Sequence, residues 1–197
     1  MDEAATPRAV GAVVLERLAQ GRTTLLATLV AREGHAYHAP GAQLAIDPDG
    51  PGAPRALVGR LSGGCVEDEV AARGRGLSVG ARRVRLDTSD DGPYGLGMGC
   101  GGLLDVVVEA VRPDRPDADA WRAWAAALAD RRPAWRWIGA DGTAAWRAGD
   151  RGTIGPEVSR GPLRDRLAEV LRDATAGPPD VQARLRPVAD GWLERVP

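Results

Sequence analysis

The sequence contains no lysine, no asparagine and no phenylalanine among its 197 residues. All 26 basic residues are therefore arginine, and since the missing residue types share A/T-rich codons, we attribute the bias to a GC-rich genome. An excess of positive charge is also absent, because the formal net charge is −1. Nucleic acids and anionic membranes attract strongly basic surfaces. We therefore expect neither as a partner, and expect the scattered arginines to lie on solvated faces.

Long apolar runs and cysteines are scarce as well. No apolar run of 18 residues occurs, so a transmembrane helix is not expected. Residues 1–8 include Asp2 and Glu3 and do not form a signal-peptide pattern, which predicts a cytoplasmic protein. In that compartment the two cysteines, Cys65 and Cys100, are expected to be thiols.

The hydrophobic periodicity predicts an α/β fold in which a mixed β-sheet is flanked by helices. Helical spacing predicts helices at residues 10–20, 65–73, 120–131 and 162–174. Apolar and alternating runs predict strands at residues 23–32, 42–46, 56–61, 82–88, 103–111, 134–139 and 143–147, with two short extended pieces at the end.

Composition changes after a linker-like segment at residues 112–119, since five of the six tryptophans follow within a short stretch. This change predicts one domain at residues 1–112 and a Trp-rich α/β extension packed on it at residues 113–197. The second part repeats the order of the first, with residues 159–165 loosely matching 61–67. This order is expected either from two pseudo-repeated halves or from the turns that commonly separate helices and strands in α/β chains.

The first segment that could bind a ligand or carry out chemistry is Ser62-Gly63-Gly64-Cys65, followed by Glu67. A strand ends here, two glycines permit a tight turn, and a helix begins. Backbone N–H groups at a helix start favour anions and thiolates. We expect the acidic residues that follow to oppose this effect, and the alternative is a purely structural turn with Cys65 buried.

The second segment, residues 93–102, is rich in glycine and ends in Gly99-Cys100-Gly101-Gly102. Glycine lets a backbone approach a ligand closely. The spacing formally matches a dinucleotide-binding fingerprint, but a strand follows where that fingerprint requires a helix. We therefore reject a nicotinamide site, and a flexible hinge is the alternative.

Both histidines, His35 and His38, lie in one further loop. With the cysteines they could supply a zinc site, but the cysteines lack the usual close spacing, so no metal site is assigned. Two other interpretations remain open. One is a cysteine enzyme with Cys65 as nucleophile and a histidine as base; the other is a non-catalytic interaction scaffold that uses the Trp-rich part as its surface.

The three segments follow one another in an order and spacing that resemble the XdhC/CoxI family, accessory proteins of molybdenum hydroxylases. The resemblance begins at Gly34 and Pro40-Gly41-Ala42 and includes the Asp-x-Asp-Gly turn at residues 47–50. It continues through residues 58–67 to residues 99–102 and 108–109. It is strong over residues 10–111 and faint afterwards. The histidine loop departs from the usual Gly-Ser-Ser-Pro-Arg and lacks its arginine. Family members also continue into a Rossmann domain, which we do not expect here.

The resemblance implies a maturation factor rather than an enzyme, serving a hydroxylase of the xanthine dehydrogenase or carbon monoxide dehydrogenase type. Such a factor binds the molybdenum cofactor transiently and assists its sulfuration and insertion. The implied partners are the hydroxylase apoenzyme, a cysteine desulfurase, a separate Rossmann-domain chain and a second copy of this chain. We expect the cofactor to contact residues of both cysteine loops, namely Ser62, Gly63, Gly64, Cys65, Glu67, Gly99, Cys100, Gly101 and Gly102.

Overall fold

The computed structural model describes residues 6–50, 54–64, 66–88, 102–130, 134–139, 144–148, 185–188 and 191–196. Its helices are α1 (Pro7–Ala19), α2 (Glu67–Gly74) and α3 (Ala118–Ala129). Its strands are β1 (Thr24–Gly34), β2 (Gln43–Asp47), β3 (Arg55–Gly59), β4 (Ala81–Asp87), β5 (Gly102–Val111), β6 (Ala134–Gly139), β7 (Ala144–Ala148), β8 (Leu185–Val188) and β9 (Gly191–Val196).

These elements confirm the α/β class and almost every predicted element within the described residues. The first helix begins three residues earlier than predicted, because Thr6 caps its N-terminus through Ala9 N and Pro7 occupies its first turn. The helix expected at residues 162–174 lies outside the described residues.

The strands form two sheets, with orders β3-β2-β1-β5-β4 and β7-β6-β9-β8. A mixed sheet was expected, but all the described strand pairs are antiparallel. Short hairpin connections join several neighbouring strands, and such connections produce antiparallel pairs.

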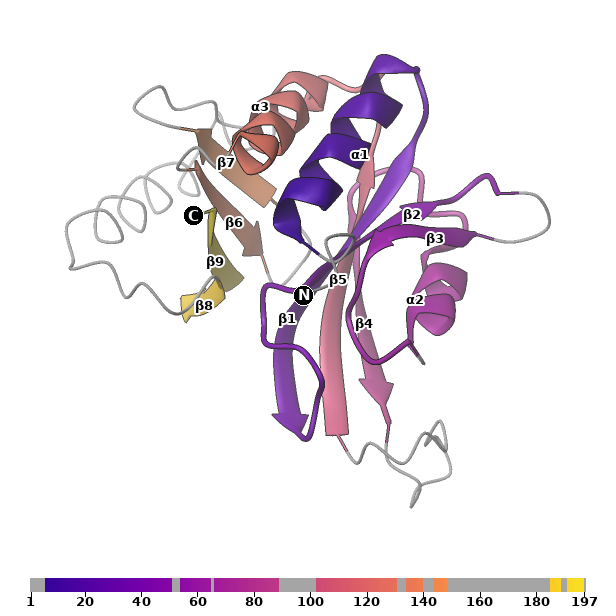
Figure 1. Cartoon of the computed structure of the whole chain (residues 1–197), viewed down its shortest axis with the longest axis vertical. Coiled ribbons are helices and arrows are strands. Elements are labelled where there is room, and N and C mark those ends of the chain that lie inside the picture. The colour runs from indigo at the N-terminus through magenta and orange to yellow at the C-terminus, as the bar shows by residue number, and fades with distance from the viewer. Residues whose placement is uncertain are drawn as a thin grey trace.

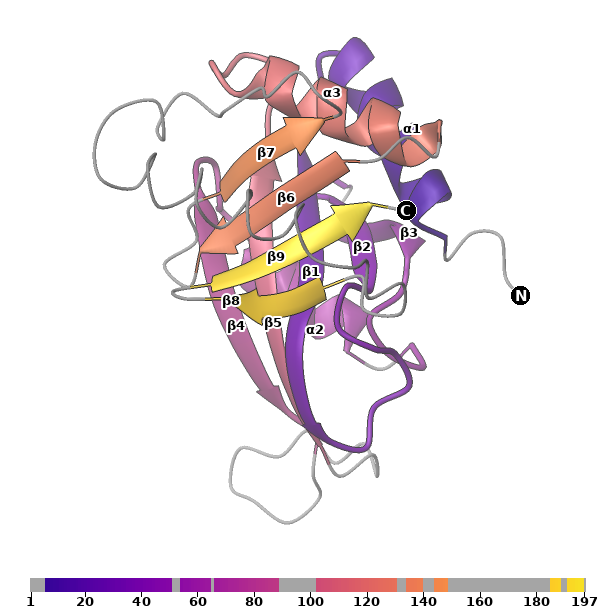
Figure 2. The ribbon, with the colours of Figure 1, turned by 90° about the vertical axis from the view of Figure 1, so that its left-hand side faces the viewer.

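Both faces of the five-stranded sheet are covered (Figure 1). Helix α2 packs on one face, over a cluster that includes Leu25, Ile46 and Val70. Helices α1 and α3 pack side by side over part of the other face. The four-stranded sheet crosses the rest of that face, as Figure 2 shows. The central strand β1 is buried from Thr24 to Val30, as expected for a strand covered on both sides.

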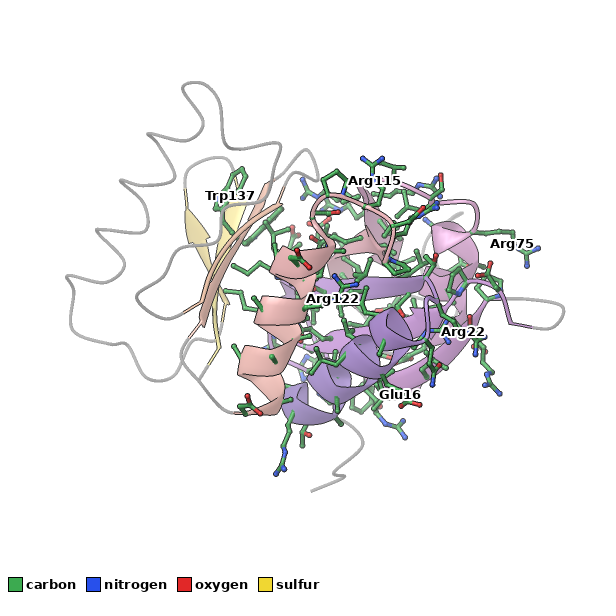
Figure 3. The ribbon with its side chains drawn as sticks, turned by 90° about the horizontal axis from the view of Figure 1, so that it is seen from above. Glu16, Arg22, Arg75, Arg115, Arg122 and Trp137 are labelled. Atoms are coloured by element: carbon green, nitrogen blue, oxygen red, sulfur yellow. The ribbon has the colours of Figure 1, made fainter. Side chains whose placement is uncertain are left out.

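Helices α1 and α3 approach closely because α1 has a glycine at the contact. A Cβ built on Gly11 would lie 2.6 Å from the carbonyl oxygen of Ala125 and 2.7 Å from Cβ of Leu128. No side chain fits in that space. Seen from above, the two helices lie against each other, with Glu16 exposed on α1 and Arg122 half-buried on α3 (Figure 3).

The two sheets repeat one arrangement, since β7, β6, β9 and β8 take the places of β2, β1, β5 and β4. The register agrees as well. Thr24 pairs with Val111 in the first sheet as Ala134 pairs with Val196 in the second. Two pairs further along the sheets, Leu26 opposite Glu109 corresponds to Arg136 opposite Glu194. The pseudo-repeat is therefore present in topology and register, although the loop match at residues 159–165 lies outside the described residues.

Candidate functional site

The turn between β3 and α2 is built around the carboxylate of Glu67. The backbone N–H groups of Leu61 and Ser62 both donate to Oε1 at 2.9 Å, and the Ser62 hydroxyl donates to Oε2 at 2.7 Å. Glu67 and Ser62 are both buried, with 7% and 4% of their surfaces exposed. Glu67, the first residue of α2, thus ties the helix to the end of the strand.

The Ser62 hydroxyl oxygen also accepts hydrogen bonds from Gly64 N at 3.0 Å and Val66 N at 3.3 Å. These two residues flank Cys65 in the sequence. We expected free N–H groups at this helix start to bind an anion. The N–H groups of Gly64 and Val66 are not free for that role, because both already donate to the Ser62 hydroxyl oxygen. Both neighbours of Cys65 are instead held by one serine.

The same hydrogen bonds set the charge of the turn. Burial by itself would raise the pKa of Glu67, but the hydroxyl of Ser62 and the N–H groups of Leu61 and Ser62 stabilise its ionised form more strongly. The pKa of Glu67 is lowered as a result. The turn is held by a carboxylate that stays ionised under mildly acidic conditions.

Apart from Gly102, which is described below, the other predicted contact residues divide into two groups. Gly63 and Gly64 are exposed, and Gly64 has a positive φ of 118°. Among the described residues, a Cβ on Gly64 would have only Nη1 of Arg60 within 4 Å, at 3.9 Å, so these residues leave the backbone accessible to a ligand. Cys65, Gly99, Cys100 and Gly101 lie outside the described residues, and their predicted role stays a prediction.

The histidine loop contacts both the Ser62–Gly64 turn and Gly102. A Cβ built on Gly63 would lie 3.1 Å from Cε2 of the Tyr37 ring, and one built on Gly102 would lie 2.4 Å from the carbonyl oxygen of His35. The Arg32 guanidinium donates to the carbonyl oxygen of Ala36 at 3.0 Å and supports the loop. The structure thus brings together the Ser62–Gly64 turn, the loop and the start of β5.

Gly102 is fixed from the side of β4. The N–H and the hydroxyl of Thr88 both donate to the carbonyl oxygen of Gly102 at 2.8 Å. Gly102 N donates to Oγ1 of Thr88 at 3.1 Å. These bonds close the strand pair at the point where the glycine-rich segment joins β5.

The cysteine-enzyme interpretation depends on the position of Cys65, which lies outside the described residues. It therefore stays a prediction. Among the described residues, no cluster of three or more His, Cys, Asp or Glu side chains could hold a metal ion. In the same part of the chain, no helix is both long and apolar enough to cross a bilayer.

The tryptophans do not support the interaction-scaffold interpretation where their side chains are described. Four tryptophans have described side chains, and each is buried, with at most 9% of its surface exposed. They are Trp121, Trp124, Trp137 and Trp192. A buried aromatic ring contributes to a core rather than to a docking surface. Figure 3 shows Trp137 on the second sheet.

Sequence reasoning missed a buried charged cluster between the two sheets. Arg136 of β6 is fully buried and donates to Glu194 at 2.9 Å, to Glu109 at 2.8 Å and to Oγ1 of Thr28 at 2.8 Å. Gln43 donates to the second oxygen of Glu194 at 2.9 Å. The cluster therefore links β1, β2 and β5 of the first sheet to β6 and β9 of the second.

The two glutamates of this cluster share one guanidinium. Burial raises the pKa of Glu109 to about 6, and the nearby charge of Glu194 adds to that effect, while Arg136 opposes it. The guanidinium also lies over the indole rings of Trp121 and Trp124, with Cζ 5.7 Å and 4.9 Å from their centroids. An arginine in an alternating Trp-Arg-Trp strand is ordinarily expected to point to solvent, so the local pattern does not predict this role.

Comparison with known proteins places the chain beside one family. Residues 17–87 match the model of the XdhC and CoxI family, which confirms the resemblance over the β3–α2 turn and the histidine loop. A relative from Bacillus subtilis (strain 168), described as a probable xanthine dehydrogenase subunit, is 34% identical over 95 residues. That alignment covers 46% of this chain and 27% of the relative.

A solved structure has a similar fold. The crystal structure of a xanthine dehydrogenase from Bacillus halodurans matches 79% of this chain and 47% of its own, with a TM-score of 0.55 and 23% identity. At this identity the match shows the fold alone. The chain spans less than half the length of both proteins.

Proposed function

We propose that this chain, whose residues 17–87 are of the XdhC and CoxI family, is an accessory protein for a molybdenum hydroxylase. In this proposal it binds the molybdenum cofactor transiently in the cytoplasm, while a cysteine desulfurase supplies sulfur to it. It then assists transfer of the cofactor to the hydroxylase apoenzyme. The chain itself is a carrier in this proposal and not a metabolic catalyst.

One observation supports the proposal most directly: hydrogen bonds hold the backbone of both neighbours of Cys65, while the glycines of the same turn are exposed. Ser62 accepts hydrogen bonds from Gly64 and Val66, and Glu67 holds Ser62. Gly63 and Gly64 remain exposed. This arrangement holds the backbone on both sides of Cys65 and leaves the glycine backbone exposed beside it, as a binding loop requires.

The described residues fit the organic part of the cofactor better than its phosphate. Molybdopterin supplies a flat pterin, a dithiolene that holds the metal, and a phosphate. The exposed glycine backbone and the aromatic ring of Tyr37 suit the flat part, and the Arg60 guanidinium lies beside Gly64. Asp68, exposed in the first turn of α2, opposes an anion. The soft metal end suits thiolates, which makes Cys65 and Cys100 the residues to test.

The proposal is tested by purifying the chain from cells that make the molybdenum cofactor. Molybdenum is measured by elemental analysis, and the pterin by its fluorescence after oxidation. We expect the wild-type chain to carry both, and the Cys65→Ser and Cys100→Ser variants to carry clearly less. Val79→Ser is the matched control, because it adds a serine at a residue 50% exposed before β4.

Two results would count against the proposal. One is a wild-type chain that carries no pterin or molybdenum even when co-expressed with the hydroxylase. The other is cysteine variants that retain as much cofactor as the wild type and the Val79→Ser control.

A further inference from the structure

Tyr37 is exceptional among the described residues. It is one of two large hydrophobic side chains that are exposed, and 70% of its surface is accessible, against 50% for Val79. Its position is also special, since its loop contacts both the Ser62–Gly64 turn and Gly102. Single exposed hydrophobic residues are common on protein surfaces and need no explanation by themselves. The geometry of this ring supplies the additional observation.

One face of the Tyr37 ring lies against Gly63. A Cβ built on Gly63 would lie 3.1 Å from Cε2, 3.2 Å from Cδ2 and 3.3 Å from Cζ. A point in the plane of the ring beyond Cε2 would be much farther from the two adjacent atoms than from Cε2. Three nearly equal distances therefore place this point over the face of the ring. Gly63 covers one face, and the large exposed fraction leaves the other face to solvent.

This arrangement makes a stacking surface. The backbone of Gly63 supports the ring on one face, and a Cβ at residue 63 would require the ring to shift by a few tenths of an ångström. Aromatic side chains bind flat heteroaromatic rings by offset stacking, and the interaction tolerates a variety of rings. The guanidinium of Arg60 lies next to Gly64 and places positive charge near the same surface.

We propose that the free face of Tyr37 stacks against the pterin ring of the molybdenum cofactor and so determines how the ring lies on the turn. This assignment rests on the proposed function and goes beyond it, because it names the residue that binds the ring. It also predicts that binding of a pterin without metal or dithiolene depends on Tyr37.

The experiment is equilibrium dialysis of the purified chain against pterin-6-carboxylate, a free pterin with one acidic group. Wild type is compared with Tyr37→Phe, which keeps the ring, and Tyr37→Ala, which removes it. Val79→Ala is the control for loss of an exposed apolar side chain. We expect Tyr37→Ala to bind about tenfold more weakly, which is the size of a lost stacking contact, while Tyr37→Phe and Val79→Ala bind as the wild type does. A urea unfolding midpoint for each variant checks that the fold is intact.

Three outcomes overturn the inference. Equal binding by the wild type and Tyr37→Ala shows that the ring is not a contact. Absence of binding by the wild type shows that the turn has no pterin surface. Equal or tighter binding of adenosine monophosphate shows a different occupant. Failure of the proposed function is recognised separately, because cofactor retention with the cysteine variants does not involve Tyr37.

Discussion

Replacing Arg136 by methionine tests whether the buried cluster holds the two sheets together. The side chain is fully buried and makes charged hydrogen bonds to Glu109 and Glu194. Methionine is similar in length but leaves two carboxylates buried without their cation. Removal of one partner from a buried ion pair costs about 3–5 kcal/mol. Since single domains are stable by only about 5–15 kcal/mol, the variant should be close to unfolding at moderate temperature.

The assay is urea unfolding followed by tryptophan fluorescence, because Trp121 and Trp124 contact Arg136 and report on the cluster directly. For a chain of this size, a loss of that magnitude lowers the melting temperature by roughly 10 °C. The matched control is Arg122→Met, at an exposed ion pair with Asp119, where a loss below about 1 kcal/mol is expected.

A triple variant separates the effect of charge from the effect of packing. Changing Glu109 and Glu194 to leucine together with Arg136→Met removes all three charges, and we expect it to recover most of the lost stability. The reasoning is refuted if Arg136→Met loses no more than Arg122→Met. It is also refuted if the triple variant is less stable than Arg136→Met alone.

Three further perturbations follow from the geometry. The pKa of Glu109 is raised to about 6, so the protonated form of Glu109 stabilises the folded state. This stabilisation is fully present below the pKa of the unfolded state and is lost as pH rises through 6. Wild type should therefore lose about 1 kcal/mol between pH 5 and 7 relative to Glu109→Gln, in urea titrations at both pH values. Glu67→Ala should cost about 2 kcal/mol and accelerate amide hydrogen exchange at Ser62, whose N–H loses its acceptor; unchanged exchange would contradict the role of the carboxylate. Gly59→Ala should destabilise the fold by more than about 2 kcal/mol, because its Cβ would lie 2.1 Å from a carbonyl oxygen of β2. Gly21→Ala, also at positive φ but with no described atom within 4 Å of the added Cβ, is the control and should cost clearly less in the same titration.

The candidate site was predictable in its segments but not in its contacts. The glycine turn, the histidine loop and the glycine-rich segment were all identified from residue type and spacing. That Tyr37 rests on Gly63 depends on how two loops far apart in the sequence meet. The role of Glu67 could have been found locally, because it lies only five residues from Ser62. Its position in the sequence suggests an acidic residue that opposes an anion, whereas its carboxylate completes the turn.

The sequence by itself determined the secondary structure, because hydrophobic periodicity and turn residues act over a few neighbouring positions. It also determined the order of the helices and strands, and that order suggested a pseudo-repeat. The tertiary structure decided the rest. Arg136 is an ordinary residue in its strand, and only the packing of one sheet on the other buries it between Glu109 and Glu194. Burial of a charge is a property of all the surrounding elements, and a local pattern carries no information about it.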